Sequence, residues 1–226
     1  MGQDPTRKEI DEATKKAELV GKYVQALEMS QDGMESKTPE FLLTAALMLR
    51  RMPVLKETEF DVEREVDGKP FKDMVKKPDV ISFLDDSKKL LVEAGKLSRN
   101  LMANQMMTAE QVAGVDALAK RIGEMKIDAN KPVGLKSFTD SISPKGVTHI
   151  TIPYIRGAAA GIAVRSYGQA PLEVSVWQGN SLVSRYTGMV VQQRWTTQQG
   201  AKGPQMFKIT IKSLGKAATP YQLFSN

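Results

Sequence analysis

Histidine is the side chain that most often performs acid–base chemistry near neutral pH, and this chain has one, His149. It alternates with Ile150 and Ile152 in a stretch with the pattern of a β-strand. A single histidine cannot build a multi-histidine metal site, and no Gly-x-Ser-x-Gly elbow accompanies it to complete a catalytic triad. The absence of cysteine excludes disulfides, thiol catalysis and cysteine-based metal sites. We therefore expect His149 to be an ordinary exposed strand residue, and we assign no catalytic residue.

Carboxylates are the next candidates for chemistry. Asp85-Asp86 and the acidic run from Glu57 to Glu65 offer oxygen ligands of the kind that bind hard cations. They lack EF-hand spacing, and a solvated helix face and loop account for them, so no metal site is assigned. A hydrolase that uses these acids remains an alternative reading. The stretch Gly157–Gly161 lacks the Lys-Ser/Thr of a phosphate loop and is not a dinucleotide fingerprint, so no cofactor is assigned either.

Aromatic and arginine side chains near the C-terminal end are the candidates for binding, because such pairs stack on sugars and bases. Trp177 is in phase with polar residues and is expected to point away from the core, whereas Trp195 is expected to pack in the core or at a sheet edge. The predicted ligand-binding residues are Trp177, Arg165, Arg185 and Arg194.

The charge of the chain is segregated. Residues 134–226 carry ten Lys and Arg but only two acids, Asp140 and Glu173, and the formal net charge of the whole chain is +6. A basic surface attracts polyanions such as an anionic glycan, lipid headgroups or nucleic acid, or an acidic protein partner. The alternative is that this charge serves solubility and docking against the more acidic first part.

Two kinds of element must position these residues. Apolar residues recur at three- and four-residue steps over 5–29, 38–52, 78–102 and 108–126, which predicts four helices. Residues 54–77 read as irregular, with a hairpin signal at Asp67-Gly68. Alternating or β-rich stretches separated by Gly, Pro and Asn predict seven strands, over 147–153, 158–166, 172–178, 182–186, 190–195, 205–212 and 221–225.

These patterns predict an α+β protein: an N-terminal helical bundle over 4–130, a linker over 131–145 and an antiparallel β-sandwich over 146–226. The apolar stripe from Ile10 to Leu27 leaves a further alternative, a helical scaffold that docks a protein partner. No run approaches the roughly 20 apolar residues that span a bilayer.

The C-terminal stretch from Phe138 to Asn226 resembles the pre-peptidase C-terminal type of β-sandwich, which accompanies other domains in exported bacterial proteins. The features that carry the resemblance are the lead-in Ser143–Gly146, the strand Leu172–Trp177 with its Gln-Gly-Asn turn, and the closing stretches Gly203–Ile211 and Tyr221–Asn226. The resemblance implies a noncatalytic accessory module outside the cytoplasm. One departure is that the family's Asp-rich strand is replaced here by a stretch with the single acid Glu173.

The functional expectation is therefore a noncatalytic, exported binding protein or cell-envelope accessory protein that uses a basic sandwich surface. Its expected partner is an anionic glycan, another polyanion or a protein, and no specific nucleic-acid motif is present. The expected compartment is extracytoplasmic, periplasmic or secreted, with a signal peptide already removed.

Overall fold

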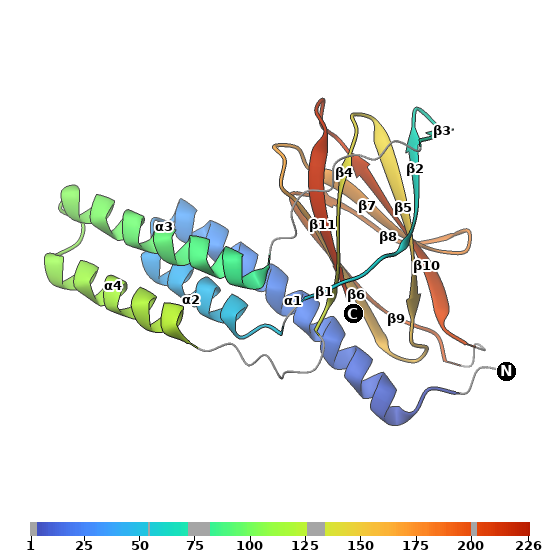
Figure 1. Ribbon diagram of the computed structural model, residues 1–226, viewed down its shortest axis with the longest axis horizontal. Helices are drawn as coiled ribbons and strands as arrows, with labels where there is room; N and C mark the ends of the chain where they lie inside the picture. The colour runs from blue at the N-terminus through green and yellow to red at the C-terminus, as the bar shows by residue number, and fades with distance from the viewer. Residues whose placement is uncertain (1–3, 54, 72–81, 126–133, 200–202) are drawn as a thin grey trace. The chain divides into compact units, whose positions relative to one another are not determined.

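The computed structural model describes residues 4–53, 55–71, 82–125, 134–199 and 203–226. The described residues form four helices and eleven strands, which confirms the α+β class (Figure 1). The chain divides into two compact units. A β unit comprises Met1–Gly21, Lys56–Val80 and Leu135–Asn226, and a helical unit comprises Lys22–Leu55 and Ile81–Gly134. None of the helices that the structure describes is both long and apolar enough to cross a membrane.

The β unit is a sandwich of two sheets. Sheet A has the strand order β1-β4-β11-β6-β9, and sheet B has the order β3-β2-β5-β10-β7-β8. All pairings are antiparallel except that of β1 with β4. The strands are β1 (Lys56–Glu57), β2 (Asp61–Val66), β3 (Lys69–Pro70), β4 (Lys136–Ile142), β5 (Gly146–Tyr154), β6 (Ala159–Ser166), β7 (Leu172–Gln178), β8 (Ser181–Gly188), β9 (Val190–Thr196), β10 (Gln205–Ser213) and β11 (Thr219–Ser225).

The core of the sandwich is built from the inward half of each alternating strand. Phe207, Ile209 and Ile211 of β10 are at most 2% exposed, as the alternation predicts. They pack with the inward residues of the neighbouring strands in one apolar cluster. The seven strands expected from Val147 onward are all present. Trp195 packs against this cluster, 5.1 Å from the ring of Phe207, which confirms its expected role.

The first part of the chain also contributes to the sandwich, which the sequence reading did not foresee. Residues 136–142, expected in a linker, form β4, and residues 61–66, read as irregular, form β2. The hairpin expected at Asp67-Gly68 is confirmed, because both residues have positive φ and join β2 to β3. The expected start of the sandwich at residue 146 is therefore too late. Each of these strands places a charged residue inward, Arg64 on β2 and Asp140 on β4, and the two form an ion pair.

Helix α1 (Arg7–Glu35) contributes its residues up to Gly21 to the β unit. It lies close to sheet A, since a Cβ added at Gly161 would be in van der Waals contact with Ala17, 3.5 Å from its carbonyl oxygen. The side chain of Asn226 ties the two together. Its Nδ2 donates to the carbonyl oxygens of Ala13 (2.9 Å) and Ala159 (3.0 Å), and its Oδ1 accepts from the N–H of Gly161 (2.8 Å).

The helical unit contains residues 22–35 of α1 together with α2 (Pro39–Arg50), α3 (Phe83–Ala103) and α4 (Ala109–Glu124). The expected capping box at the start of α4 is present, with Thr108 and Gln111 bonded reciprocally. Its apolar core draws on α2, α3 and α4 and includes Leu42, Ala94 and Val115. The four predicted helices are thus confirmed, with ends that differ by a few residues.

Candidate ligand-binding surface and pocket

The four predicted binding residues lie in two different sheets. Trp177 (β7) and Arg185 (β8) belong to sheet B, whereas Arg165 (β6) and Arg194 (β9) belong to sheet A. Each alternates with an inward neighbour and so faces outward from its own sheet. Stacked sheets lie about 10 Å apart, and outward side chains on the two sheets point in opposite directions. The structure therefore brings Trp177 and Arg185 onto one face and leaves Arg165 and Arg194 on another.

The face that holds Trp177 and Arg185 has an ordered set of polar side chains. Strand register aligns five outward residues across five neighbouring strands of sheet B, which we call the central row: Glu63, His149, Thr210, Ser175 and Arg185. Within this row, His149 Nδ1 is 3.0 Å from Thr210 Oγ1, and Arg185 Nε donates to Ser175 Oγ at 3.0 Å. These bonds leave the terminal amino groups of Arg185 without a bond in the central row.

A second row runs parallel to the central row: Asp61, Thr151, Lys208, Trp177 and Leu182. Trp177 is partly exposed between Lys208 and Leu182. The ammonium of Lys208 lies 3.9 Å from Glu63 Oε2, a distance at which an exposed pair contributes little. An aromatic ring with cations on the same face can stack on a ligand and bind its anionic groups.

His149 is more enclosed than the sequence suggested, with 14% of its side chain exposed. Burial lowers its pKa, and the nearby Lys208 adds to this, while Glu65 and Glu63 oppose the shift. The imidazole is therefore mainly neutral at pH 7. In the neutral form, its Nδ1 can either donate a hydrogen bond to the Thr210 hydroxyl or accept one from it, so this contact is kept at pH 7.

The carboxylates considered for catalysis do not converge. Asp85 bonds to Ser82 at the start of α3, and its side chain is 51% exposed. Asp61 and Glu63 are exposed along β2. Among the residues that the structure describes, no group of three or more His, Asp or Glu could hold a metal ion. The alternative of a helical scaffold that docks a partner through the stripe from Ile10 to Leu27 requires this stripe to be exposed. Ala17 and Val20 of the stripe are instead buried within this chain.

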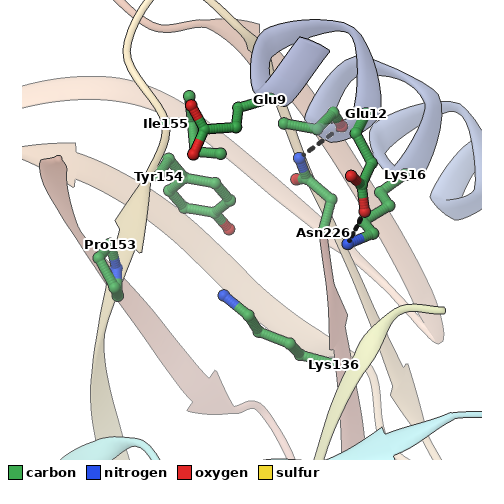
Figure 2. Close-up of a pocket in the computed structure, with 9 residues that line it drawn as sticks. Glu9, Glu12, Lys16, Lys136, Pro153, Tyr154, Ile155 and Asn226 are labelled. Carbon is green, nitrogen blue, oxygen red and sulfur yellow. Dashed lines mark hydrogen bonds and ion pairs between the residues drawn. The ribbon is translucent and has the colours of Figure 1, made fainter. Parts of the chain in front are cut away.

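A pocket of about 190 Å³ lies at one end of the sandwich, beside the first turns of α1 (Figure 2). Figure 2 shows the ammonium of Lys136 directed into this space, toward the side of the pocket where the Tyr154 hydroxyl lies. The sequence reading missed Lys136, because it placed this residue in the linker. A signal was present, since Lys136, Phe138, Asp140 and Ile142 alternate with Ser and Thr in the manner of a strand.

Comparisons with known proteins add a weak likeness of fold. No protein-family model and no curated protein sequence matches the chain. One similar solved structure is the Yersinia pseudotuberculosis-derived mitogen, with a TM-score of 0.34, 15% identity and coverage of 41% of this chain and 85% of that one. Another is the pre-peptidase C-terminal domain of a Bacillus anthracis collagenase, with a TM-score of 0.34, 9% identity and coverage of 41% and 89%.

A third similar structure is a family GH115 4-O-methyl-alpha-glucuronidase, with a TM-score of 0.30, 10% identity and coverage of 63% of this chain and 25% of that one. The expected likeness to the pre-peptidase C-terminal type of sandwich is thus a weak resemblance of fold over about two-fifths of the chain. Likeness at this distance says nothing about what the protein binds.

Proposed function

We propose that the protein is a noncatalytic binding protein that holds an anionic glycan on the outer face of sheet B. The observation that carries the proposal is the pair of in-register rows on this face, which set Trp177 among hydrogen-bonding and cationic side chains. Trp177 supplies a ring face for stacking on a sugar. Arg185 bonds to Ser175 through Nε, and its terminal amino groups, which have no bond in the central row, can donate to a carboxylate.

The charges on this face favour an anionic ligand at one side. Strands β10, β7 and β8 carry three basic residues, Lys208, Lys212 and Arg185. Their one acidic residue is Glu173. The acids of β2 lie at the opposite side of the same sheet, beyond β5. A negatively charged chain is therefore expected to lie over β10, β7 and β8, where electrostatic attraction is favourable and salt-dependent.

The same geometry supports binding rather than catalysis. His149 bonds to Thr210, and its Nε2 lies 3.6 Å from Glu65 Oε1, so both ring nitrogens face side chains of the protein and no serine or threonine other than Thr210 is bonded to it among the described residues. Strand pairing fixes the backbone under both rows, with a register shift between Val176 and Trp177 where β7 pairs with β8. A surface held by paired strands loses little conformational entropy on binding.

The test is binding of polygalacturonate, a carboxylated polysaccharide, by isothermal titration calorimetry at low and high salt. Trp177→Ala and Arg185→Gln are each expected to weaken binding about tenfold, and high salt is expected to weaken it further. Arg194→Gln is the matched control, because Arg194 is an exposed arginine on the other sheet. Absence of binding at low salt rejects the proposal, and an equal loss in Arg194→Gln moves the site to sheet A.

A glycan of the cell envelope would require the protein to work outside the cytoplasm, as the family resemblance implies. Fractionation of cells that express the complete gene tests this part. Recovery of the protein in the cytoplasm alone would remove the envelope role while leaving the glycan-binding measurement unaffected.

A further inference from the structure

Strand β4 carries two charged side chains on its inward face, Lys136 and Asp140, and they differ in whether an opposite charge lies beside them. Lys136, Phe138, Asp140 and Ile142 share this face, and two of them belong to the apolar core. Asp140 is 1% exposed and is compensated by Arg64, whose Nε and Nη2 lie 2.9 and 2.8 Å from its Oδ2. Lys136 is half-buried, and its ammonium makes no ion pair or hydrogen bond with the residues that the structure describes.

The pocket in front of Lys136 is built from three segments of the β unit. Its walls come from α1 (Glu9, Glu12, Ala13, Lys16), from the end of β5 and the residue after it (Pro153, Tyr154, Ile155), and from Asn226. Burial raises the pKa of the Tyr154 hydroxyl, which stays neutral and shares a hydrogen bond of 2.9 Å with Ser225 Oγ. The pocket therefore combines apolar wall surface with the half-buried ammonium of Lys136, and its other charged residues, Glu9, Glu12 and Lys16, lie on α1.

Both carboxylates at the pocket are occupied by other partners. Glu9 accepts from the backbone N–H of Thr6 at 2.7 Å and from its hydroxyl at 2.8 Å, and these bonds lower the pKa of Glu9. Glu12 pairs with Lys16 at 2.9 Å, and that contact lowers the pKa of Glu12. Neither is within ion-pairing distance of Lys136, so the chain supplies no counter-charge from these residues.

The neighbours of Lys136 make its charge still less favourable. Lys56 of β1 is its partner in the parallel register of β1 and β4, and Lys16 projects from α1 toward the same region. Burial is the largest cause that lowers the pKa of Lys136, and the charges of Lys16 and Lys56 add to it. A bound anion would offset these effects, because its attraction to the ammonium of Lys136 opposes both the cost of burial and the repulsion from Lys16 and Lys56.

We propose that this pocket binds the carboxylate group of a small organic acid, with the ammonium of Lys136 as its counter-ion. The carboxylate would lie between Lys136 and the Tyr154 hydroxyl, and the rest of the molecule would contact Ala13, Pro153 and Ile155. This site is separate from the outer face of sheet B, because Lys136 faces inward from sheet A at the end of the sandwich.

The experiment combines two measurements on the full chain with benzoate, glucuronate and inorganic phosphate as probes. Amine labelling followed by mass spectrometry reports the reactivity of each lysine. A bound carboxylate is expected to slow labelling of Lys136 about fivefold at saturation and to leave Lys216 unchanged. Lys216 is the internal control because it is exposed in the turn at the opposite end of β11.

The second measurement is the thermal midpoint of unfolding. A carboxylate at about ten times its Kd is expected to raise the midpoint of the native chain by a few degrees and that of Lys136→Met not at all. Lys136→Met is also expected to unfold at a higher temperature than the native chain without ligand, since it removes an unpaired buried charge. Lys216→Met is the matched control and is expected to respond as the native chain does.

Three results would overturn the proposal: no protection of Lys136 by either carboxylate, protection by phosphate alone, or an equal ligand-induced shift in Lys136→Met. The labelling measurement uses the native chain alone, so it still tests the proposal if Lys136→Met folds poorly. Failure here is distinguishable from failure of the glycan proposal, because Lys136→Met should bind polygalacturonate as the native chain does.

Discussion

The ion pair between Arg64 and Asp140 offers a direct test of how the sandwich is assembled. It joins β2, from the first third of the chain, to β4, across the two sheets. Replacement of Arg64 by Met keeps most of the side-chain volume and removes both donors from Asp140 Oδ2. The carboxylate would then remain 1% exposed without its counter-charge.

The expected cost follows from the burial of the two partners. Loss of one member of a buried ion pair typically costs 3–5 kcal/mol, because the other charge stays desolvated. Arg64 is 28% exposed, so water partly replaces it, and we expect about 3 kcal/mol, at the lower end of that range. For a protein of this size, that loss lowers the thermal midpoint by roughly 10 °C.

The assay is urea and thermal unfolding of four proteins: the native chain, Arg64→Met, the double variant Arg64→Met with Asp140→Leu, and Arg194→Met. The double variant is expected to recover most of the lost stability, because no unpaired charge remains. Arg194→Met removes an exposed arginine and should change the midpoint little. If Arg64→Met unfolds within about 2 °C of the native chain, the pair does not bridge the sheets, and the placement of β2 is wrong.

Three further perturbations follow from single contacts. Asn226→Ala removes three hydrogen bonds to Ala13, Ala159 and Gly161, should cost about 2 kcal/mol and should increase hydrogen exchange in residues 7–21; unchanged exchange there contradicts the docking of α1. Thr108→Ala removes the cap of α4 and should cost about 1 kcal/mol in urea unfolding, whereas Thr108→Ser should not. Burial lowers the pKa of His149 below 6.5, so the unfolded chain binds more protons than the folded chain as the pH falls through 6.5. The free energy of unfolding should therefore decline on acidification. His149→Gln should reduce that decline, and an unchanged pH profile in this variant contradicts the lowered pKa.

The helices and the later strands could be predicted because their signals are local. The inward series Phe207, Ile209 and Ile211 specifies a half-buried strand wherever it pairs, and the Thr108–Gln111 box specifies the start of a helix by its own hydrogen bonds. Local patterns gave only a hairpin signal for β2 and left β4 in the expected linker, because each strand places a charged residue inward. These two charges are compatible with burial only in each other's presence.

The candidate site shows the same limit. Composition and phase were enough to select Trp177 and Arg185 as outward residues, but they selected Arg165 and Arg194 on the same grounds. Only the pairing of the strands separates the two pairs, since it assigns β7 and β8 to one sheet and β6 and β9 to the other. Lys136 became identifiable as a site residue only once α1, the end of β5 and Asn226 formed a pocket around it.

The amino-acid sequence by itself determined the secondary structure of most segments, the α+β class and the basic character of the C-terminal part. Tertiary structure decided which strands share a sheet, which charges are compensated and which ammonium is left facing a pocket. The physical reason is that periodicity and capping act over a few residues, whereas sheet membership and burial of charge depend on hydrogen bonds and contacts between residues far apart in the chain.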